Sequence, residues 1–168
     1  MIKNGKMSST KAKEVKSMED MLKQENIKIV DKIDNWEDAI RISVKPLVEG
    51  GYVKNSYIDN IIASTYELGP YYVLVKDVAF IHGRPESGVL KKQLAVTLLR
   101  EPVIFSEKTY PVRLLIALAA TDSESHIDTM RTLATIFMDE HKVEEIVNAK
   151  TEEEIYQMFL KAGRETQE

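Results

Sequence analysis

Apolar residues recur at helical spacing in several stretches of this 168-residue chain. After Asn35, which suits an N-cap, they return every three or four residues as far as Gly50, so a helix is predicted between these two residues. Pro46 falls inside this pattern and should kink the helix, because proline has no backbone N–H. A second helix is predicted over residues 56–66, with Ile58, Ile61, Ile62 and Tyr66 on its buried side. Further helices are predicted over residues 18–24, from 123 onward, over 143–147 and from 151 onward.

Shorter apolar runs predict the strands. Residues 27–30 alternate between apolar and polar, while 71–75, 94–99 and 112–119 are β-branched or continuously apolar, as in strands covered by helices on both faces. Strands interspersed with helices predict an α/β fold, a three-layer α/β/α sandwich around a mixed sheet of four or five strands. We expect one domain over residues 18–161, preceded by a mobile N-terminal extension (1–17) and followed by a C-terminal tail (162–168).

Composition narrows the classes of function. The formal net charge is -4, with basic and acidic residues interspersed, so a nucleic-acid partner has no electrostatic support. The chain has no cysteine, which excludes disulfides and thiol nucleophiles and fits a cytoplasmic location. The longest apolar stretch, residues 114–120, is far shorter than the roughly 20 residues of a transmembrane helix. No nucleotide-binding glycine loop and no close pair of histidines occurs, so we expect neither a cofactor nor a metal ion.

One histidine lies in a turn-rich segment, Ile81-His82-Gly83-Arg84-Pro85-Glu86-Ser87-Gly88. An imidazole can be an uncharged nucleophile at neutral pH and can bond covalently to a phosphoryl group. On local sequence alone, a loop histidine that only hydrogen-bonds its own turn is the commoner explanation. The residues around the segment are therefore needed to decide whether His82 is a nucleophile or only a hydrogen-bonding residue of its turn.

With Gly69-Pro70-Tyr71 upstream and Lys91-Lys92 downstream, the segment resembles the phosphorylation site of the enzyme IIA family of the bacterial sugar phosphotransferase system. The resemblance is to the mannitol/fructose superfamily, particularly its ascorbate-type branch, and it covers roughly residues 18–160. It implies the same α/β/α architecture. It also implies that His82 accepts a phosphoryl group from the histidine phosphocarrier protein HPr and passes it to a cysteine of enzyme IIB. The membrane is then reached only indirectly, through enzyme IIC.

The sequence departs from the family at two backbone-shaping positions. The family usually has proline immediately before the active histidine and glycine some residues earlier, whereas this chain has Ile81 and, near the second position, Asp77. These differences bear on the conformation of the loop. An aspartate that pointed inward would also repel phosphate.

Other residues are candidates for binding the phosphoryl group. His126 is predicted to lie at a helix N-terminus, where N–H groups favour phosphate, and the resemblance implies a supporting active-site histidine there. Without the resemblance, a solvated first-turn residue is the simpler interpretation. Arg84 could contact phosphate oxygens or only pair with Glu86. Ser87 and Thr97 are hydroxyls near predicted loop ends. The third histidine, which is His141, is expected to be solvated.

Two functions from different classes remain open. The first is a phosphoryl carrier in sugar uptake, and the second is a stand-alone enzyme IIA-like regulatory protein controlled by phosphorylation. A carrier should present an apolar docking patch around His82, and Phe80 and Ile81 are candidates for its centre, with Arg84 and Glu86 at its rim. A buried strand residue is an equally good interpretation of Phe80. The transported sugar cannot be read from these residues.

Overall fold

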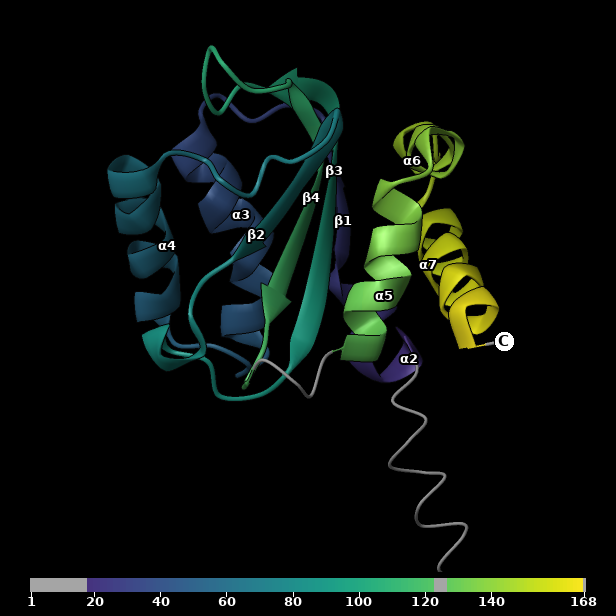
Figure 1. Ribbon diagram of the computed structural model, residues 1–168, viewed down its shortest axis with the longest axis horizontal. Helices are drawn as coiled ribbons and strands as arrows, with labels where there is room; N and C mark the ends of the chain where they lie inside the picture. The colour runs from purple at the N-terminus through teal and green to yellow at the C-terminus, as the bar shows by residue number, and fades with distance from the viewer. Residues whose placement is uncertain (1–17, 123–126, 168) are drawn as a thin grey trace, which may run out of the picture.

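The computed structural model describes residues 18–122 and 127–167 and arranges them as a four-stranded mixed sheet with helices on both faces (Figure 1). In chain order its elements are α2 (Met18–Met21), the 3-10 helix η1 (Gln24–Asn26), β1 (Ile27–Val30), α3 (Trp36–Glu49), α4 (Asn55–Leu68), β2 (Asp77–His82), the 3-10 helix η2 (Pro85–Ser87), β3 (Gln93–Val103), β4 (Val112–Ala119), α5 (Ile127–Phe137), α6 (Glu140–Val147) and α7 (Glu152–Gln167).

The sheet has the strand order β1-β3-β4-β2. The pairs β1/β3 and β2/β4 are parallel, and the central pair β3/β4 is antiparallel. Because β2 and β4 are parallel, their carboxyl ends meet at one edge of the sheet. In register, His82 lies opposite Leu118 of β4, which in turn lies opposite Leu94 near the start of β3.

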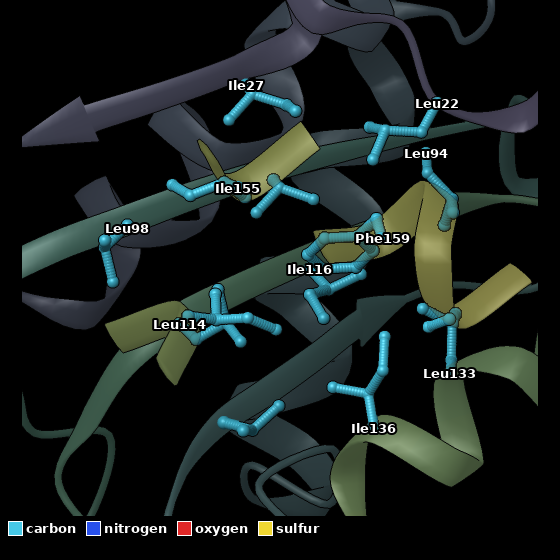
Figure 2. Close-up of a cluster of buried hydrophobic side chains, with 14 of the residues drawn as sticks. Leu22, Ile27, Leu94, Leu98, Leu114, Ile116, Leu133, Ile136, Ile155 and Phe159 are labelled. Carbon is cyan, nitrogen blue, oxygen red and sulfur yellow. The ribbon is translucent and has the colours of Figure 1, made fainter. Parts of the chain in front are cut away.

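Helices α3 and α4 cover one face of the sheet, and α2, α5, α6 and α7 cover the other (Figure 1). Successive residues of β3 alternate between the two cores, so Leu94 faces the α5 side while Ala95 faces the α3 side. Figure 2 shows Phe159 of α7 and Leu133 of α5 packed against sheet residues of the core on the α5 side. The predicted three-layer α/β/α sandwich is therefore confirmed, and burial on both faces explains the continuous apolar runs.

The helix ends are set by local chemistry, as predicted. The side chain of Asn35 accepts a 2.8 Å hydrogen bond from the backbone N–H of Asp38, which is the geometry of an N-cap. Helix α3 then continues through Pro46 to Glu49, and the kink at Pro46 stays a prediction.

The last helix reaches beyond the predicted domain boundary. Helix α7 runs to Gln167, and Ala162 is buried in the core. Most of the expected C-terminal tail is thus part of the domain. The expected extension over residues 1–17 and the predicted start of a helix at residue 123 lie outside the described residues.

The predicted strand over residues 71–75 is wrong. Tyr71 and Val73 donate their backbone N–H groups to the carbonyls of Gly69 and Pro70, so the chain turns here instead of extending. Along the backbone, a hydrogen bond from Phe80 to the Tyr72 carbonyl and an isolated bridge at Val75 join this segment to the sheet. The strand is β2, which begins at Asp77, and His82 is its last residue and not part of a loop.

Asp77 has a φ of 70°, a left-handed backbone conformation that favours glycine but that aspartate tolerates. This explains why a glycine would suit the same place. Asp77 begins β2 while His82 ends it, so the two are roughly 16 Å apart at about 3.3 Å per residue. The aspartate therefore does not bring its charge to the histidine.

Within residues 18–122 and 127–167, none of the helices has the length and apolar character that crossing a membrane would require.

Candidate active site

His82 ends β2 at the edge of the sheet where β4 also ends, and its side chain is half-buried. Helix α5 begins at this same edge (Figure 1). The site therefore has one strand-end histidine, the carboxyl end of a second strand and the N-terminus of a helix. Such edges of α/β sheets are common places for reactive groups.

The imidazole of His82 is oriented by its own strand. Its Nδ1 lies 2.8 Å from the carbonyl oxygen of Phe80, and because a carbonyl only accepts, Nδ1 carries the proton. In the neutral ring Nε2 then carries the lone pair. The ring also packs on Phe80, with centroids 5.1 Å apart, and against the edge of Tyr71, at 5.6 Å and an interplanar angle of 89°. The hydrogen bond and the two aromatic contacts restrict rotation of the imidazole.

Two tyrosine hydroxyls hold the backbone that follows the histidine. Tyr71 donates a 3.0 Å hydrogen bond to the carbonyl of His82, and the N–H of Gly83 donates a 2.8 Å hydrogen bond to the hydroxyl of Tyr57. The Tyr57 hydroxyl in turn donates to the carbonyl of Leu118, also at 2.8 Å. Burial raises the pKa of Tyr57 to about 12, so the phenol keeps the proton that it donates.

The first two turns of α4 hold the rest of the loop after His82. Asn60 donates from its side chain to the carbonyl of Ser87, and Lys54 donates its backbone N–H to the carbonyl of Gly88. Gly88 has a φ of 128°, and a Cβ there would lie 3.1 Å from the Ser56 hydroxyl. A side chain at this position would be strained, so the close approach of loop and helix depends on glycine.

Arg84 is the predicted phosphate-binding residue that remains close to His82. It lies two residues after the histidine and is exposed. Burial raises the pKa of Tyr71, and the nearby charge of Arg84 opposes that rise. Among the ion pairs of the described residues, none joins Arg84 to Glu86.

Ser87 lies in η2, within the same loop. Thr97, in contrast, is not brought to the site. It is buried in the middle of β3, in register with Leu115 and thus three residues along the sheet from the level of His82. It was expected near a loop end, but β3 begins earlier and runs longer than the apolar run that predicted it. Its side-chain oxygen has no hydrogen-bond partner and faces the α3 side of the sheet.

The expected centre of a docking patch is also wrong. Phe80 is 5% exposed and Ile81 is fully buried, because both belong to β2.

His126 lies outside the described residues. His141 is exposed in the first turn of α6, as predicted. Across residues 18–122 and 127–167, no three His, Cys, Asp or Glu side chains are grouped so that they could hold a metal ion.

Sequence reasoning missed Tyr57 and Tyr71 as site residues. Tyr71 was visible only as part of the Gly69-Pro70-Tyr71 motif. Tyr57 gave no signal of its own, because a tyrosine on a predicted helix is usually a core residue.

Comparison with known proteins decides the family. Residues 20–162 match the model of the family described as phosphoenolpyruvate-dependent sugar phosphotransferase system, EIIA 2. The chain belongs to this EIIA 2 family. Its members are phosphotransferase components, and the match spans every described element of the site from β2 to α5.

Individual EIIA relatives of two types match over most of their length. The mannitol-specific cryptic phosphotransferase enzyme IIA component of Escherichia coli K12 is 34% identical over 82% of this chain and 94% of its own. The ascorbate-specific EIIA component of Shigella boydii is 31% identical over 86% of this chain and 96% of its own. The similar identities do not single out the ascorbate type.

A solved structure adds a partner for one relative. It is the complex of the mannitol enzyme IIA and phosphorylated enzyme IIB from Escherichia coli, whose matching chain has a TM-score of 0.72 and 29% identity, over 83% of this chain and 98% of that one.

Proposed function

We propose that this EIIA component accepts a phosphoryl group from HPr on Nε2 of His82 and passes it to a cysteine of enzyme IIB during sugar uptake. The observation that carries the proposal is the hydrogen bond between Nδ1 of His82 and the carbonyl of Phe80. It fixes the tautomer in which Nε2 is the nucleophile. It also keeps the ring in place without help from a partner protein.

The two transfers balance on this nitrogen. The Nε2 lone pair attacks the phosphorus of the donor phosphohistidine, a new N–P bond forms, and the N–P electron pair of the donor returns to its imidazole. His82 keeps the proton on Nδ1, so the phosphorylated ring is cationic and its bond to the Phe80 carbonyl becomes stronger. A thiolate of enzyme IIB then attacks phosphorus, and the electron pair returns to Nε2.

Other groups of the site would stabilise the transferring phosphoryl group. A loose transition state needs mainly alignment and charge stabilisation on its equatorial oxygens. The N-terminus of α5 lies at the same edge as His82 and offers its dipole. We assign His126, which directly precedes α5, a donor role toward these oxygens, and we assign Arg84 and the Ser87 hydroxyl a similar one.

The partner surface would lie around this edge. Tyr71, Leu90 and Ile127 are exposed apolar residues that belong to the segments around His82, and they replace Phe80 and Ile81 as candidates for its centre. The enzyme IIB bound to the mannitol relative supports the assignment of an enzyme IIB as one partner. The exchange would take place in the cytoplasm, with the membrane component enzyme IIC binding the sugar.

The test is phosphorylation of the purified protein by phosphoenolpyruvate, enzyme I and HPr. We expect an acid-labile, base-stable adduct that transfers to a cysteine of the cognate enzyme IIB within seconds to minutes. His82→Ala should take up no phosphate, while His141→Ala, which removes an exposed histidine of α6, should behave as the parent does. Normal uptake by His82→Ala would refute the proposal. An adduct that forms readily but transfers to no enzyme IIB would favour a regulatory protein.

A further inference from the structure

The peptide group between His82 and Gly83 is held at both of its ends by side chains. Its carbonyl oxygen accepts the 3.0 Å hydrogen bond from the Tyr71 hydroxyl, and its N–H donates the 2.8 Å hydrogen bond to the Tyr57 hydroxyl. Because a peptide group is planar, these two bonds fix the orientation of one plane. Neither bond belongs to the sheet, whose β2 ends at His82.

This plane needs an external restraint. The pairing of β2 with β4 stops at His82 and Leu118, so no further strand pairing holds the chain beyond this plane, and Gly83 lacks the side chain that would narrow its own backbone freedom. Rotation of the plane changes ψ of His82. The side-chain rotamers open to a residue depend on its φ and ψ, so this change would weaken the preference for the rotamer in which Nδ1 of His82 reaches the Phe80 carbonyl at 2.8 Å.

Both tyrosines are themselves fixed. Tyr57 comes from the first turn of α4, is 1% exposed, and is anchored a second time through the Leu118 carbonyl at the end of β4. The ring of Tyr71 packs edge-on against the imidazole of His82 and also against Tyr72. The two hydroxyls thus connect the histidine to α4, to β4 and to the turn before β2.

We propose that Tyr57 and Tyr71 are positioning residues for phosphoryl transfer, because together they clamp the His82–Gly83 peptide and so set the direction of Nε2. This inference rests on the proposed function of His82. It adds two residues that touch neither the phosphoryl group nor the lone pair directly.

The test compares phenylalanine variants, which keep each ring and remove only the hydroxyl. Tyr57→Phe, Tyr71→Phe and the double variant are assayed for single-turnover uptake from phosphorylated HPr at increasing HPr concentration. Tyr66→Phe is one control, since it lies on the same helix and its exposed hydroxyl bonds Glu37. Tyr72→Phe is the other, since Tyr72 is as buried as Tyr57 and its hydroxyl bonds Thr65 instead of the His82–Gly83 peptide.

We expect Tyr57→Phe to lower the rate at saturating HPr by about 10- to 100-fold, the range in which a displaced reacting group costs rate. Tyr71→Phe should also slow the reaction. The HPr concentration for half-maximal rate should not change in Tyr57→Phe, because Tyr57 is buried and cannot touch HPr. Removing either hydroxyl releases the same His82–Gly83 peptide plane. The double variant should therefore be slowed by less than the product of the two single effects. In nitrogen-15 spectra, both single variants should show less of the Nδ1–H tautomer of His82.

Parent-like rates in both single variants would overturn the clamp, and so would losses no larger than that of Tyr72→Phe. Independent, fully multiplied effects would show that the two hydroxyls do not act on one peptide plane. If Tyr57→Phe does not fold, the partly exposed Tyr71→Phe decides alone. These outcomes are separate from the proposed function, which fails only if the parent is not phosphorylated on His82.

Discussion

At the scale of single residues, two hydrogen bonds hold His82 and a third holds the peptide N–H of Gly83 that follows it. The Phe80 carbonyl holds Nδ1, Tyr71 holds the carbonyl, and Tyr57 holds the next N–H. Only Nε2 is left to react. In the proposed function, these bonds would prepare His82 for nucleophilic attack before any partner binds and so lower the cost of alignment in the transition state.

His126 should matter to rate more than to folding. We expect His126→Ala to slow uptake from HPr by about 100-fold, the usual cost of losing one well-placed donor to a transition state. The melting temperature should change little, since a residue at the start of a helix contributes little to a core. Rapid-quench kinetics and thermal unfolding measure the two effects. An unchanged rate would make His126 a merely solvated residue.

The buried phenol of Tyr57 should make stability depend on alkaline pH. Its pKa is about 12 in the folded protein and near 10 in the unfolded chain. Between these values the unfolded state releases a proton that the folded state keeps, so the free energy of unfolding falls as the pH rises. At about 1.4 kcal/mol per pKa unit, this difference lowers the free energy of unfolding by roughly 2 kcal/mol at pH 12.

Urea unfolding between pH 9 and 11.5 tests this prediction. The stability of Tyr57→Phe should fall less steeply with pH than that of the parent, although Tyr72, whose pKa burial also raises, titrates in both proteins. Parallel slopes for the two proteins would contradict it.

At the scale of elements, helices and strands could be predicted where the pattern of apolar residues was long or the cap was unambiguous. The run over residues 112–119 coincides with β4, and the Asn35 cap begins α3 where expected. The strand expected over 71–75 failed because a β-branched, aromatic run does not reveal the Gly69-Pro70 turn that continues into it.

Helix α4 shows how a mostly correct face can still hide a site residue. Ile61 is buried as predicted, and Ile58 and Ile62 pack partly buried against the same core. Tyr66 was wrongly placed on this side, since it is 70% exposed, and the buried stripe also contains Tyr57 and Thr65. The expected face did not include Tyr57, the residue that joins the helix to the site.

Helix α7 should stabilise the fold through its apolar face. Phe159 is fully buried against the sheet (Figure 2), so Phe159→Ala should lower the free energy of unfolding by roughly 3–5 kcal/mol through lost burial and the cavity left behind. Gln157→Ala, on the exposed side of the same helix, should stay within about 0.5 kcal/mol of the parent. Denaturant unfolding measures both, and equal effects would contradict this packing.

At the scale of the molecule, the mixed strand order brings distant segments to one edge. The carboxyl ends of β2 and β4, the first turns of α4 and the start of α5 meet there, although they are spread from residue 55 to residue 127. The fold class could be predicted from the periodicity of apolar residues. The dense motif around His82 singled out this histidine as a candidate, and its role stays a prediction. The tautomer and the two tyrosine contacts could not, because they arise only when the chain is folded.

The most direct measurement locates the phosphoryl group. Protein labelled with nitrogen-15 in its histidines is phosphorylated by phosphoenolpyruvate, enzyme I and HPr, and the modified nitrogen is identified by NMR from its shift and its coupling to phosphorus. We expect a single phosphoryl group on Nε2 of His82. A phosphoryl group on Nδ1 of His82, or on His126 or His141, would contradict the central claim.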